Sequence, residues 1–558
     1  MVIVYSSPSK KRLDVANYDL VSKQFTSMFP EENVTSFLSD AGANSFYAVP
    51  QSIFKISAKG QEDRFFKVDF ENGERISLNV QGQVLQIEPI GNGMIGINTA
   101  SKPGTQEWVY TQPTGTTLPL LTFQAEDRKH FSGFLTRYYD PIKRAHALFL
   151  YTTSTDTLVI SDINLQTGEK AIVAKDKADI RNVFIQPHIG LQAYVRNFQQ
   201  PEWIVNDSTL DTDFAFLSKG DSFLSGVWSR SKDDQRWLVT HLTSRGQEEV
   251  SIYDRPSRRL TRVNQTGNSL IAHGPALQVR SAVVVSRDNT PLVSYLTTPA
   301  DKACLQNNCP MVVYIHGGPH ARDEYPRSPV IAWLVNRGYA VLTVNYRGSS
   351  GFGKSFESMS KGQWGLAMQD DVLDAVDWAI QTKVADPQKI AVMGASHGGF
   401  LAVNSITVAP DRFACAVVSA ATGDLASFVE KVVATQPWLA TDLYESVGDT
   451  RISEVKTALK ARSPISKIAE VKAPILITHG GKDQQSPLSD AEAYAAALHA
   501  GGKKVAFAVF PEEGHGVNSP DTKLVYYGII ENFLAACLGG KSEPGALTID
   551  KSKIDIRL

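Results

Sequence analysis

The sequence predicts two domains of different fold class, an all-β domain followed by a doubly wound, mostly parallel α/β domain. Three observations support this prediction. At 558 residues the chain is too long for one hydrophobic core. Its first half consists of short alternating segments broken by Gly, Asn, Asp and Pro, whereas from about residue 279 apolar strands alternate with helical patterns. We therefore expect domains at residues 1–278 and 279–541, with a C-terminal tail at 542–558.

A hairpin pattern recurs through residues 1–278. A strand ends on an apolar residue, a polar residue and a tight turn follow, and a second strand begins. The polar position falls at Asp19, Asp69, Thr111, Asn164, Asn206 and Asp254. The matches at Thr111 and Asn206 are the looser ones, and the spacings are 42 to 53 residues with a mean of 47. This period favours the four-stranded blades of a β-propeller, and a β-sandwich with regular turns is the alternative.

The N-terminal end of this propeller is expected to be unusual. The first hairpin begins near Arg12, which is too close to Met1 for two earlier strands of the same blade. The ring is therefore predicted to be incomplete or closed by another device.

One motif in this half resembles a nucleotide site. Residues 91–96 match the Gly-x-Gly-x-x-Gly fingerprint of dinucleotide-binding folds. The residues that follow, with Pro103 and Gly104 among them, cannot form the helix that would hold a pyrophosphate. We interpret the motif as a turn.

The α/β pattern begins with a hairpin whose turn is at residues 286–290. Near-continuous apolar strands then alternate with helices, which is typical of a parallel sheet covered on both faces. The expected strands are 311–315, 340–344, 390–393, 415–418, 475–478 and 505–510. The expected helices are 330–336, 370–381, 401–408, 489–500 and 522–538.

Ser396 lies in the sequence Gly-Ala-Ser-His-Gly-Gly-Phe at residues 394–400, between an expected strand and an expected helix. Strand, Gly-x-Ser-x-Gly and helix form the nucleophile elbow of α/β-hydrolases. Side chains at Gly394 and Gly398 would collide with the strand and the helix. The turn would leave the Ser396 hydroxyl exposed at the carboxyl edge of the sheet, which predicts a catalytic nucleophile.

A serine nucleophile needs a base, and the base needs an orienting acid. In this fold the order along the chain is Ser, then Asp or Glu, then His. Asp483 follows the expected strand 475–478, and His515 follows the expected strand 505–510. We therefore predict a triad of Ser396, His515 and Asp483. Weaker competitors are His479, Glu513 and Asp490, and Asp490 is expected to cap a helix.

The tetrahedral intermediate also needs an oxyanion hole. The backbone N–H of His397, directly after the nucleophile, is expected to supply one donor. The other should come from the glycine-containing segment 316–320, which follows strand 311–315. The N–H of Gly318 is the first candidate and that of Gly317 the second.

Composition excludes several other function classes. The formal net charge is −2, so no field for binding nucleic acid is implied, and no apolar run approaches the roughly 18 residues of a membrane helix. The N-terminus does not have the pattern of a signal peptide. The triad needs no metal or organic cofactor, and homo-oligomerisation is left open.

The four cysteines bear on the compartment. Cys415 and Cys537 lie in apolar segments and are expected to be buried thiols. Cys304 and Cys309 share a polar loop, where a local disulfide is favoured over two free thiols. Without a leader the chain is expected in the cytoplasm. A disulfide would instead indicate a periplasmic or secreted protein whose leader has been removed.

Residues 279–541 resemble the prolyl oligopeptidase family of serine peptidases, most of all its acylaminoacyl-peptidase branch. The segments that carry the resemblance stand in the family's order: 316–320, 345–353, 364–365 with 370–372, 394–400, 463–464 and 479–483. The resemblance implies an N-terminal β-propeller, usually of seven blades, that caps the active site and excludes folded proteins. It also implies a serine peptidase acting on short peptides. A carboxylesterase on the same fold is the alternative.

The sequence departs from the family at several points. Prolyl and dipeptidyl peptidases place a Tyr where His316 stands, and its hydroxyl helps to bind the oxyanion, so an oxyanion hole made only of backbone groups is implied here. The dipeptidyl peptidases of the family hold the free amine of the substrate with a pair of glutamates in the propeller. Here the pair Glu248 and Glu249 lies in an expected strand, so we assign it no such role. Ser486 replaces an apolar residue common after the catalytic Asp. Seven blades of this period would need about 329 residues, against roughly 278.

Overall fold

The computed structural model describes residues 154–186, 189–220, 222–243, 247–264, 277–299, 309–325, 328–543 and 553–558 in full. Before residue 154 it describes the strands given below, with side chains at residues 107–110, 118–123, 135 and 146–152.

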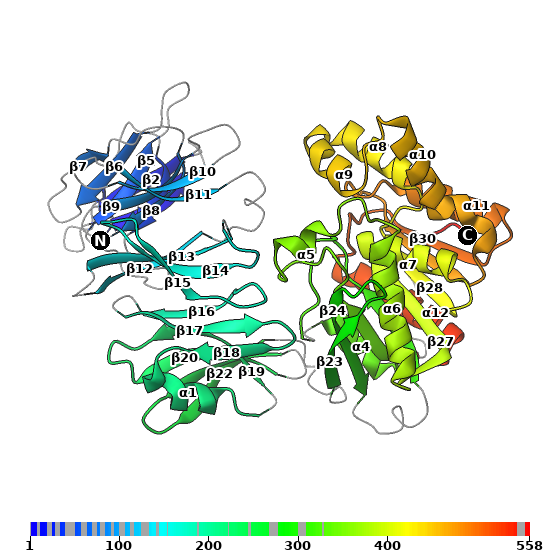
Figure 1. Cartoon of the computed structure of the whole chain (residues 1–558), viewed down its shortest axis with the longest axis horizontal. Helices are drawn as coiled ribbons and strands as arrows, with labels where there is room; N and C mark the ends of the chain where they lie inside the picture. Colours follow the sequence, from blue (N-terminus) through cyan, green and yellow to red (C-terminus); the bar gives the residue numbers. More distant parts are fainter. Residues whose placement is uncertain are drawn as a thin grey trace.

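The first half of the described chain consists of antiparallel sheets (Figure 1). The first sheet contains β1 (Val2–Ser7), β2 (Arg12–Tyr18), β3 (Phe25–Ser27), β4 (Val34–Ser39), β5 (Gln51–Ile56), β6 (Arg64–Asp69) and β7 (Arg75–Leu78). Two four-stranded sheets follow, with β8 (Val84–Ile90), β9 (Met94–Thr99), β10 (Gln106–Thr111) and β11 (Thr117–Phe123), then β12 (Gly133–Asp140), β13 (Arg144–Tyr151), β14 (Val159–Asn164) and β15 (Lys170–Ala174). The next sheet has β16 (Val183–Gln186), β17 (Gly190–Asn197) and β18 (Pro201–Val205), and the last has β19 (Phe223–Arg230), β20 (Arg236–Leu242), β21 (Glu248–Asp254) and β22 (Arg259–Thr266).

Most of the expected hairpins are present. The strands on either side of Asp19, Asp69, Thr111, Asn164 and Asp254 pair antiparallel, and Asp19 itself lies outside the described residues. The prediction of a hairpin at Asn206 is wrong. After β18 the chain forms a 3-10 turn, η2 (Ser208–Leu210), and helix α1 (Asp211–Leu217) in place of a second strand. Of the nucleotide-like motif, residues 94–96 begin β9, which pairs antiparallel with β8, and residues 91–93 lie outside the described residues. That these sheets form a propeller stays a prediction.

The second half is built on one mixed sheet with the strand order β23-β24-β26-β25-β27-β28-β29-β30-β31. The run from β26 to β30 is parallel, and β23, β24 and β31 pair antiparallel at its two ends. The strands are β23 (Leu277–Val285), β24 (Pro291–Pro299), β25 (Cys309–Ile315), β26 (Ala340–Val344), β27 (Ala385–Ala395), β28 (Cys415–Ser419), β29 (Ile475–Gly480), β30 (Val505–Phe510) and β31 (Asp555–Ile556). The helices are α4 (Pro329–Asn336), α5 (Lys354–Ser358), α6 (Ala367–Gln381), α7 (His397–Val408), α8 (Leu425–Thr435), α9 (Ala440–Ser446), α10 (Ser453–Arg462), α11 (Leu488–Ala500) and α12 (Pro520–Leu538), with 3-10 segments η3 (Pro437–Leu439) and η4 (Pro464–Glu470).

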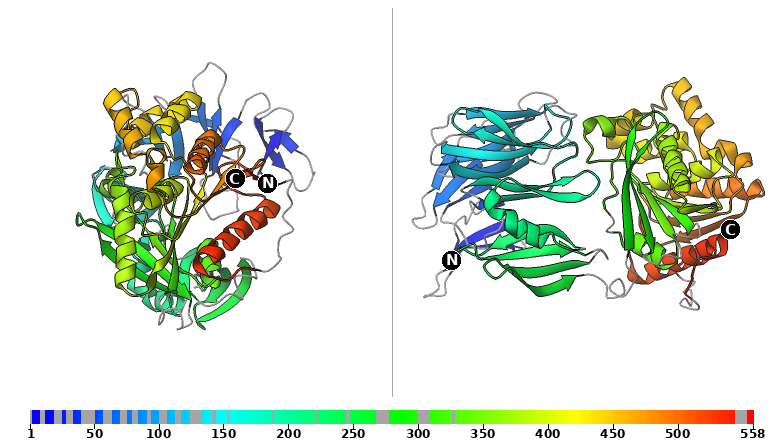
Figure 2. Two further views of the ribbon diagram at one scale, coloured as in Figure 1. Left: turned by 90° about the vertical axis from the view of Figure 1, so that its right-hand side faces the viewer. Right: turned by 60° about the horizontal axis from the view of Figure 1, so that its bottom comes forward.

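Helices cover both faces of this sheet, as the apolar strands predict. Because side chains alternate along a strand, Val312 of β25 packs with α4 and α12, whereas Met311 and Val313 pack with α6, α7 and α8. Figure 2 shows α12 and α6 on opposite faces. The predicted α/β-hydrolase fold is confirmed, and the carboxyl ends of β25 to β30 lie along one edge.

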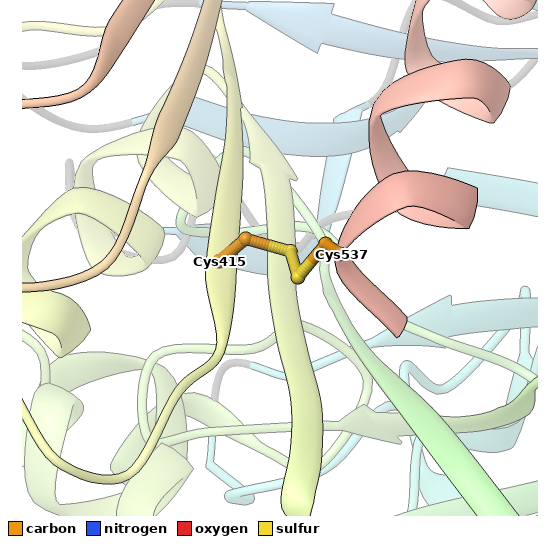
Figure 3. Close-up of a disulfide and its surroundings, with 2 residues drawn as sticks. All are labelled: Cys415 and Cys537. Atoms are coloured by element: carbon orange, nitrogen blue, oxygen red, sulfur yellow. A yellow bond between two sulfur atoms is a disulfide. The ribbon is translucent and has the colours of Figure 1, made fainter. Parts of the chain in front are cut away.

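A disulfide joins Cys415 at the start of β28 to Cys537 near the end of α12 (Figure 3). The two Cα atoms are 6.4 Å apart although 122 residues separate them in sequence. The expectation of two buried thiols was therefore wrong. An apolar setting is compatible with both states, and only the packing of α12 on β28 brings the sulfurs together. Cys309 is also disulfide-bonded, and Cys304 lies outside the described residues.

Candidate active site

Ser396 stands between the end of β27 and the start of α7, as predicted. Its backbone has φ 57° and ψ −125°, a left-handed φ that is uncommon for a residue with a side chain. Two hydrogen bonds hold this turn: the Ser396 N–H donates to Ser419 O at 2.9 Å, and the Phe400 N–H donates to Ser396 O at 3.0 Å. The serine is half-buried in a strained elbow at the carboxyl edge of the sheet.

The glycines of this motif are required by close backbone contacts. A Cβ atom at Gly394 would overlap the carbonyl of Gly398, because strand and helix cross at that point. A Cβ atom at Gly398 would overlap the carbonyl of Ile315 and lie 2.7 Å from that of His316. In the structure a side chain at Gly394 would therefore collide with helix α7, and a side chain at Gly398 would collide with the end of β25.

Asp483 and His515 lie together in the loops that follow β29 and β30. His515 Nδ1 is 2.8 Å from Asp483 Oδ2, and the N–H groups of Gln485 and Ser486 donate to Oδ1 at 2.8 and 2.9 Å. Burial acts to raise the pKa of Asp483, but the hydrogen bond from His515 and those from the backbone outweigh it, so this pKa lies below its ordinary value. The Asp483 side chain is fully buried and ionised, whereas that of His515 is 24% exposed.

Backbone contacts join the two loops that carry these residues. The Gly481 N–H donates to Phe510 O, and the Lys482 N–H donates to Glu513 O, both at 2.8 Å. A Cβ atom at Gly480 would overlap the carbonyl of Gly514. Glycine before Asp483 therefore allows the loops to touch, which fixes the spacing between the acid and the imidazole.

The segment after β25 lies against the elbow. A Cβ atom at Gly317 would be 3.1 Å from Ala395 O and 3.4 Å from Ser396 Cβ. Gly318 has φ 125°, in a region that favours glycine. Gly317 thus lies against the turn that carries Ser396, so the segment that holds the candidate donor Gly318 adjoins the start of α7, where His397 stands.

The competing acids have other partners. Glu513 accepts hydrogen bonds from the N–H groups of Asn518 and Ser519, just before α12. Asp490 is buried in the first turn of α11 and binds Lys431 and Ser427 of α8. It joins two helices, so the expectation that it caps a helix was wrong.

Sequence reasoning treated His479 only as a competitor for a catalytic role. Its side chain is fully buried, with Nε2 3.0 Å from Ser486 O and 3.5 Å from Asp483 Oδ2. Burial lowers its pKa, so the ring is neutral, and it helps to hold the turn that presents Asp483. Its place four residues before Asp483, at the end of a buried strand, is the signal that could have indicated this contact.

Two parts of the second half contact the strand-rich half: Arg322, which lies just after the segment 316–320, and the start of α5. The Arg322 guanidinium donates to Asn197 O and, at 2.9 Å, to Phe198 O, and it lies 4.1 Å from the centre of the Phe352 ring. Asp156 accepts a hydrogen bond from the Ser355 N–H at 2.7 Å, at the start of α5. Figure 1 shows α5 facing the strand-rich half.

Comparison with known proteins gives a family match on the second half. The model of the prolyl oligopeptidase family matches residues 327–541. The chain is 33% identical over 419 residues to dipeptidyl aminopeptidase BIII of Pseudoxanthomonas mexicana, covering 73% of this chain and 60% of that protein. It is 36% identical over 219 residues to an acylamino-acid-releasing enzyme of Arabidopsis thaliana, covering 38% of this chain and 28% of that enzyme. The chain thus spans about 60% or less of these curated relatives.

Solved structures match over nearly the whole chain. A puromycin-hydrolyzing peptidase of Mycobacterium tuberculosis superposes with a TM-score of 0.65 at 18% identity, covering 97% of this chain and 87% of that one. An acylaminoacyl peptidase of Pyrococcus horikoshii superposes with a TM-score of 0.61 at 16% identity, covering 98% and 90%. At these identities the matches show a shared fold.

Proposed function

Because residues 327–541 belong to the prolyl oligopeptidase family, we propose that this chain is a serine peptidase that hydrolyses short peptides. Ser396, His515 and Asp483 are its proposed catalytic residues. The observation that carries the proposal is the 2.8 Å contact of His515 Nδ1 with Asp483, on the sheet edge where Ser396 occupies a nucleophile elbow.

In the proposed reaction His515 Nε2 takes the proton of the Ser396 hydroxyl while Oγ attacks the scissile carbonyl carbon. The N–H groups of Gly318 and His397 hold the resulting oxyanion. His515 then gives the proton to the leaving amine, the C–N bond breaks, and an acyl-enzyme remains. Water, deprotonated by the same imidazole, hydrolyses that ester. Asp483 accepts a hydrogen bond from the Nδ1–H group of His515, which fixes the tautomer and stabilises the imidazolium form.

The proposed substrates are short peptides. The strand-rich half contacts the segment next to the oxyanion loop through Arg322 and α5, so it lies where it could restrict access of large substrates. Relatives named acylamino-acid-releasing enzyme and dipeptidyl aminopeptidase both support peptide substrates, with blocked and free N-termini respectively.

We also propose that the protein works in an oxidising compartment. Structural disulfides persist in the periplasm or outside the cell and are rare in the cytosol. Cys415, Cys537 and Cys309 are all disulfide-bonded. Among the helices that the structure describes, none is both long and apolar enough to cross a membrane.

The test is kcat/KM on a matched panel of amides and esters. N-acetylated aminoacyl anilides, free-amine dipeptidyl anilides and nitrophenyl esters carrying the same residues are compared. We expect efficient anilide cleavage by the wild-type chain, none by Ser396→Ala, and a loss of about 10⁴-fold in kcat for Asp483→Asn, because an amide would favour the wrong His515 tautomer.

Two outcomes would contradict the proposal. Ester turnover with negligible anilide cleavage would assign the chain to the esterases. Anilide cleavage that survives Ser396→Ala would place the chemistry elsewhere. Among positive outcomes, the preference between acetylated and free-amine anilides identifies which end of the peptide is recognised.

A further inference from the structure

The phenol of Tyr346 lies between the two segments that supply the candidate oxyanion donors. Tyr346 follows β26 closely and its side chain is completely buried. Its hydroxyl oxygen is 2.9 Å from His316 O and 3.1 Å from His397 Nδ1. His316 immediately precedes the Gly317–Gly318 pair, and the His397 N–H is the other candidate donor. One hydroxyl group thus contacts both sides of the oxyanion hole from behind.

The number of protons on each group determines which group donates in the two hydrogen bonds of the Tyr346 hydroxyl. A carbonyl oxygen can only accept, so Tyr346 donates its single proton to His316 O. The phenol oxygen can then accept a proton from His397, which places the ring proton of His397 on Nδ1. Burial lowers the pKa of His397 well below its ordinary value, with smaller effects from His316 and His320, so the ring is neutral and has that one proton.

The contact with His316 O determines how the next peptide group is oriented. In a trans peptide the C=O and N–H groups point in opposite directions. Because Tyr346 holds the His316 carbonyl, the N–H of Gly317 points away from the phenol. The same carbonyl lies beside Gly398, where a Cβ atom would approach it to 2.7 Å. The path of the oxyanion segment therefore depends on where the phenol stands.

Ring packing keeps the hydroxyl in place. The His316 ring stacks on Tyr346 with centroids 4.4 Å apart and an interplanar angle of 16°. Trp364 packs edge-on against His397 at 4.2 Å. Ser349 fixes the far side of His316 through a 2.9 Å hydrogen bond to Nε2. The packing of these rings fixes the position of the Tyr346 hydroxyl relative to His316 and His397.

We propose that Tyr346 is a positioning residue that sets the distance between the two halves of the oxyanion hole. This inference rests on the proposed peptidase function. Tyr346 does not touch the substrate. It acts through its hydroxyl oxygen, which hydrogen-bonds both the His316–Gly317 peptide and the His397 ring. Its loss should therefore weaken binding of the transition state more than binding of the substrate.

The test compares Tyr346→Phe with Tyr339→Phe, an equally buried tyrosine that packs with α4 and α12 on the other face of the sheet. We expect Tyr346→Phe to lower kcat on the best anilide roughly tenfold with little change in KM. Removal of an oxyanion donor itself costs roughly 100- to 1,000-fold. The affinity for a peptide aldehyde, which forms an oxyanion with Ser396, should fall by the same factor as kcat, whereas that for the corresponding peptide alcohol should not change.

A double-mutant cycle with His397→Phe, which keeps the backbone donor, completes the test. Both substitutions break the same Tyr346–His397 bond, so their effects on kcat should be less than multiplicative. The inference is overturned if Tyr346→Phe matches Tyr339→Phe in kcat and aldehyde affinity, if aldehyde and alcohol affinities fall equally, or if the cycle is multiplicative. If instead the wild-type chain cleaves no anilide, the proposed peptidase function fails, and the role proposed for Tyr346 in that reaction fails with it.

Discussion

Asp323 carries a buried carboxyl group outside the proposed triad. Its Oδ2 has no hydrogen-bond partner among the described residues, and burial raises its pKa to about 8. The backbone around it is well fixed, because the Asp323 N–H donates to Asn345 Oδ1 and its carbonyl accepts from Asn345 Nδ2. The residue therefore lies in a rigid, poorly solvated setting that disfavours its charge.

This setting predicts how stability changes with pH. The pKa of Asp323 is higher in the folded chain than in the unfolded chain, where it is near 3.8, so the folded state binds the proton more tightly. The contribution of Asp323 to the free energy of unfolding therefore falls as pH rises from about 4 to about 8. Asp323→Asn removes this effect, and we expect its Tm to exceed that of the wild type by a few degrees at pH 8.5 and to match it near pH 4.

The control for this prediction is Asp411→Asn, which removes an exposed carboxylate paired with Lys472. A surface pair contributes little, so its Tm should follow the wild type at every pH. Thermal melts from pH 4 to pH 9 measure the difference. Parallel curves for Asp323→Asn and the wild type would show that Asp323 is ionised at little cost.

At the level of elements, the Cys415–Cys537 disulfide ties a central strand to the C-terminal helix. Closing a loop of this length lowers the entropy of the unfolded chain. We expect Cys415→Ala with Cys537→Ala to lower the free energy of unfolding by about 3–5 kcal/mol. The kcat on anilides should be nearly unchanged, because Ser396 contacts Ser419, at the other end of β28 from Cys415. Thermal melts and anilide kinetics check both parts.

The control is the wild-type chain treated with reductant. If Cys415–Cys537 dominates the effect, reduction should lower the wild-type Tm and leave that of the double variant nearly unchanged. A double variant as stable as the wild type would show that packing of α12 alone holds it on the sheet.

The sequence predicted elements well where one pattern determined them. Strands such as β26 and β30, apolar along their length, appear with their expected bounds. The region between β28 and β29 was not predicted. Its helices α9 and α10 contain few buried residues, so an apolar stripe is almost absent there. Helix α1 was missed because seven residues are too few for a periodic pattern, although Phe214 and Leu217 anchor it in the core.

The candidate site was predictable to a similar extent. Order along the chain and position after strands were enough to place Ser396, Asp483 and His515. The contacts of Tyr346 were not predictable, because they depend on groups that follow neighbouring strands, His316 after β25 and His397 after β27. The Cys415–Cys537 pairing needed the packing of α12 for the same reason. The contact of His479 is local, and its place four residues before Asp483 could have indicated it.

On the scale of the whole molecule, Arg322 is a main contact between the two halves. It binds two carbonyls of the strand-rich half and packs on Phe352 of the hydrolase half. We expect Arg322→Ala to loosen this contact and admit larger substrates. The ratio of kcat/KM for a 20-residue peptide to that for a dipeptidyl anilide should rise several-fold.

Arg462→Ala is the matched control, since Arg462 also binds two carbonyls, those of Gly362 and Val447, but within the hydrolase half. It should lower stability without changing the ratio. An unchanged ratio in Arg322→Ala, or an equal rise in both variants, would indicate that substrate size is selected elsewhere.

The contact between the Asp483 and His515 loops has a consequence for how this protein could change in evolution. Gly480 and Gly514 touch backbone to backbone, and two hydrogen bonds join the neighbouring residues. If only one of the two loops were replaced by that of a relative, its backbone would no longer fit the backbone of the other loop. The two segments, whose residues Asp483 and His515 are 32 positions apart in the chain, should therefore be inherited and exchanged as a single module. A chimaera with a new substrate preference would have to carry both.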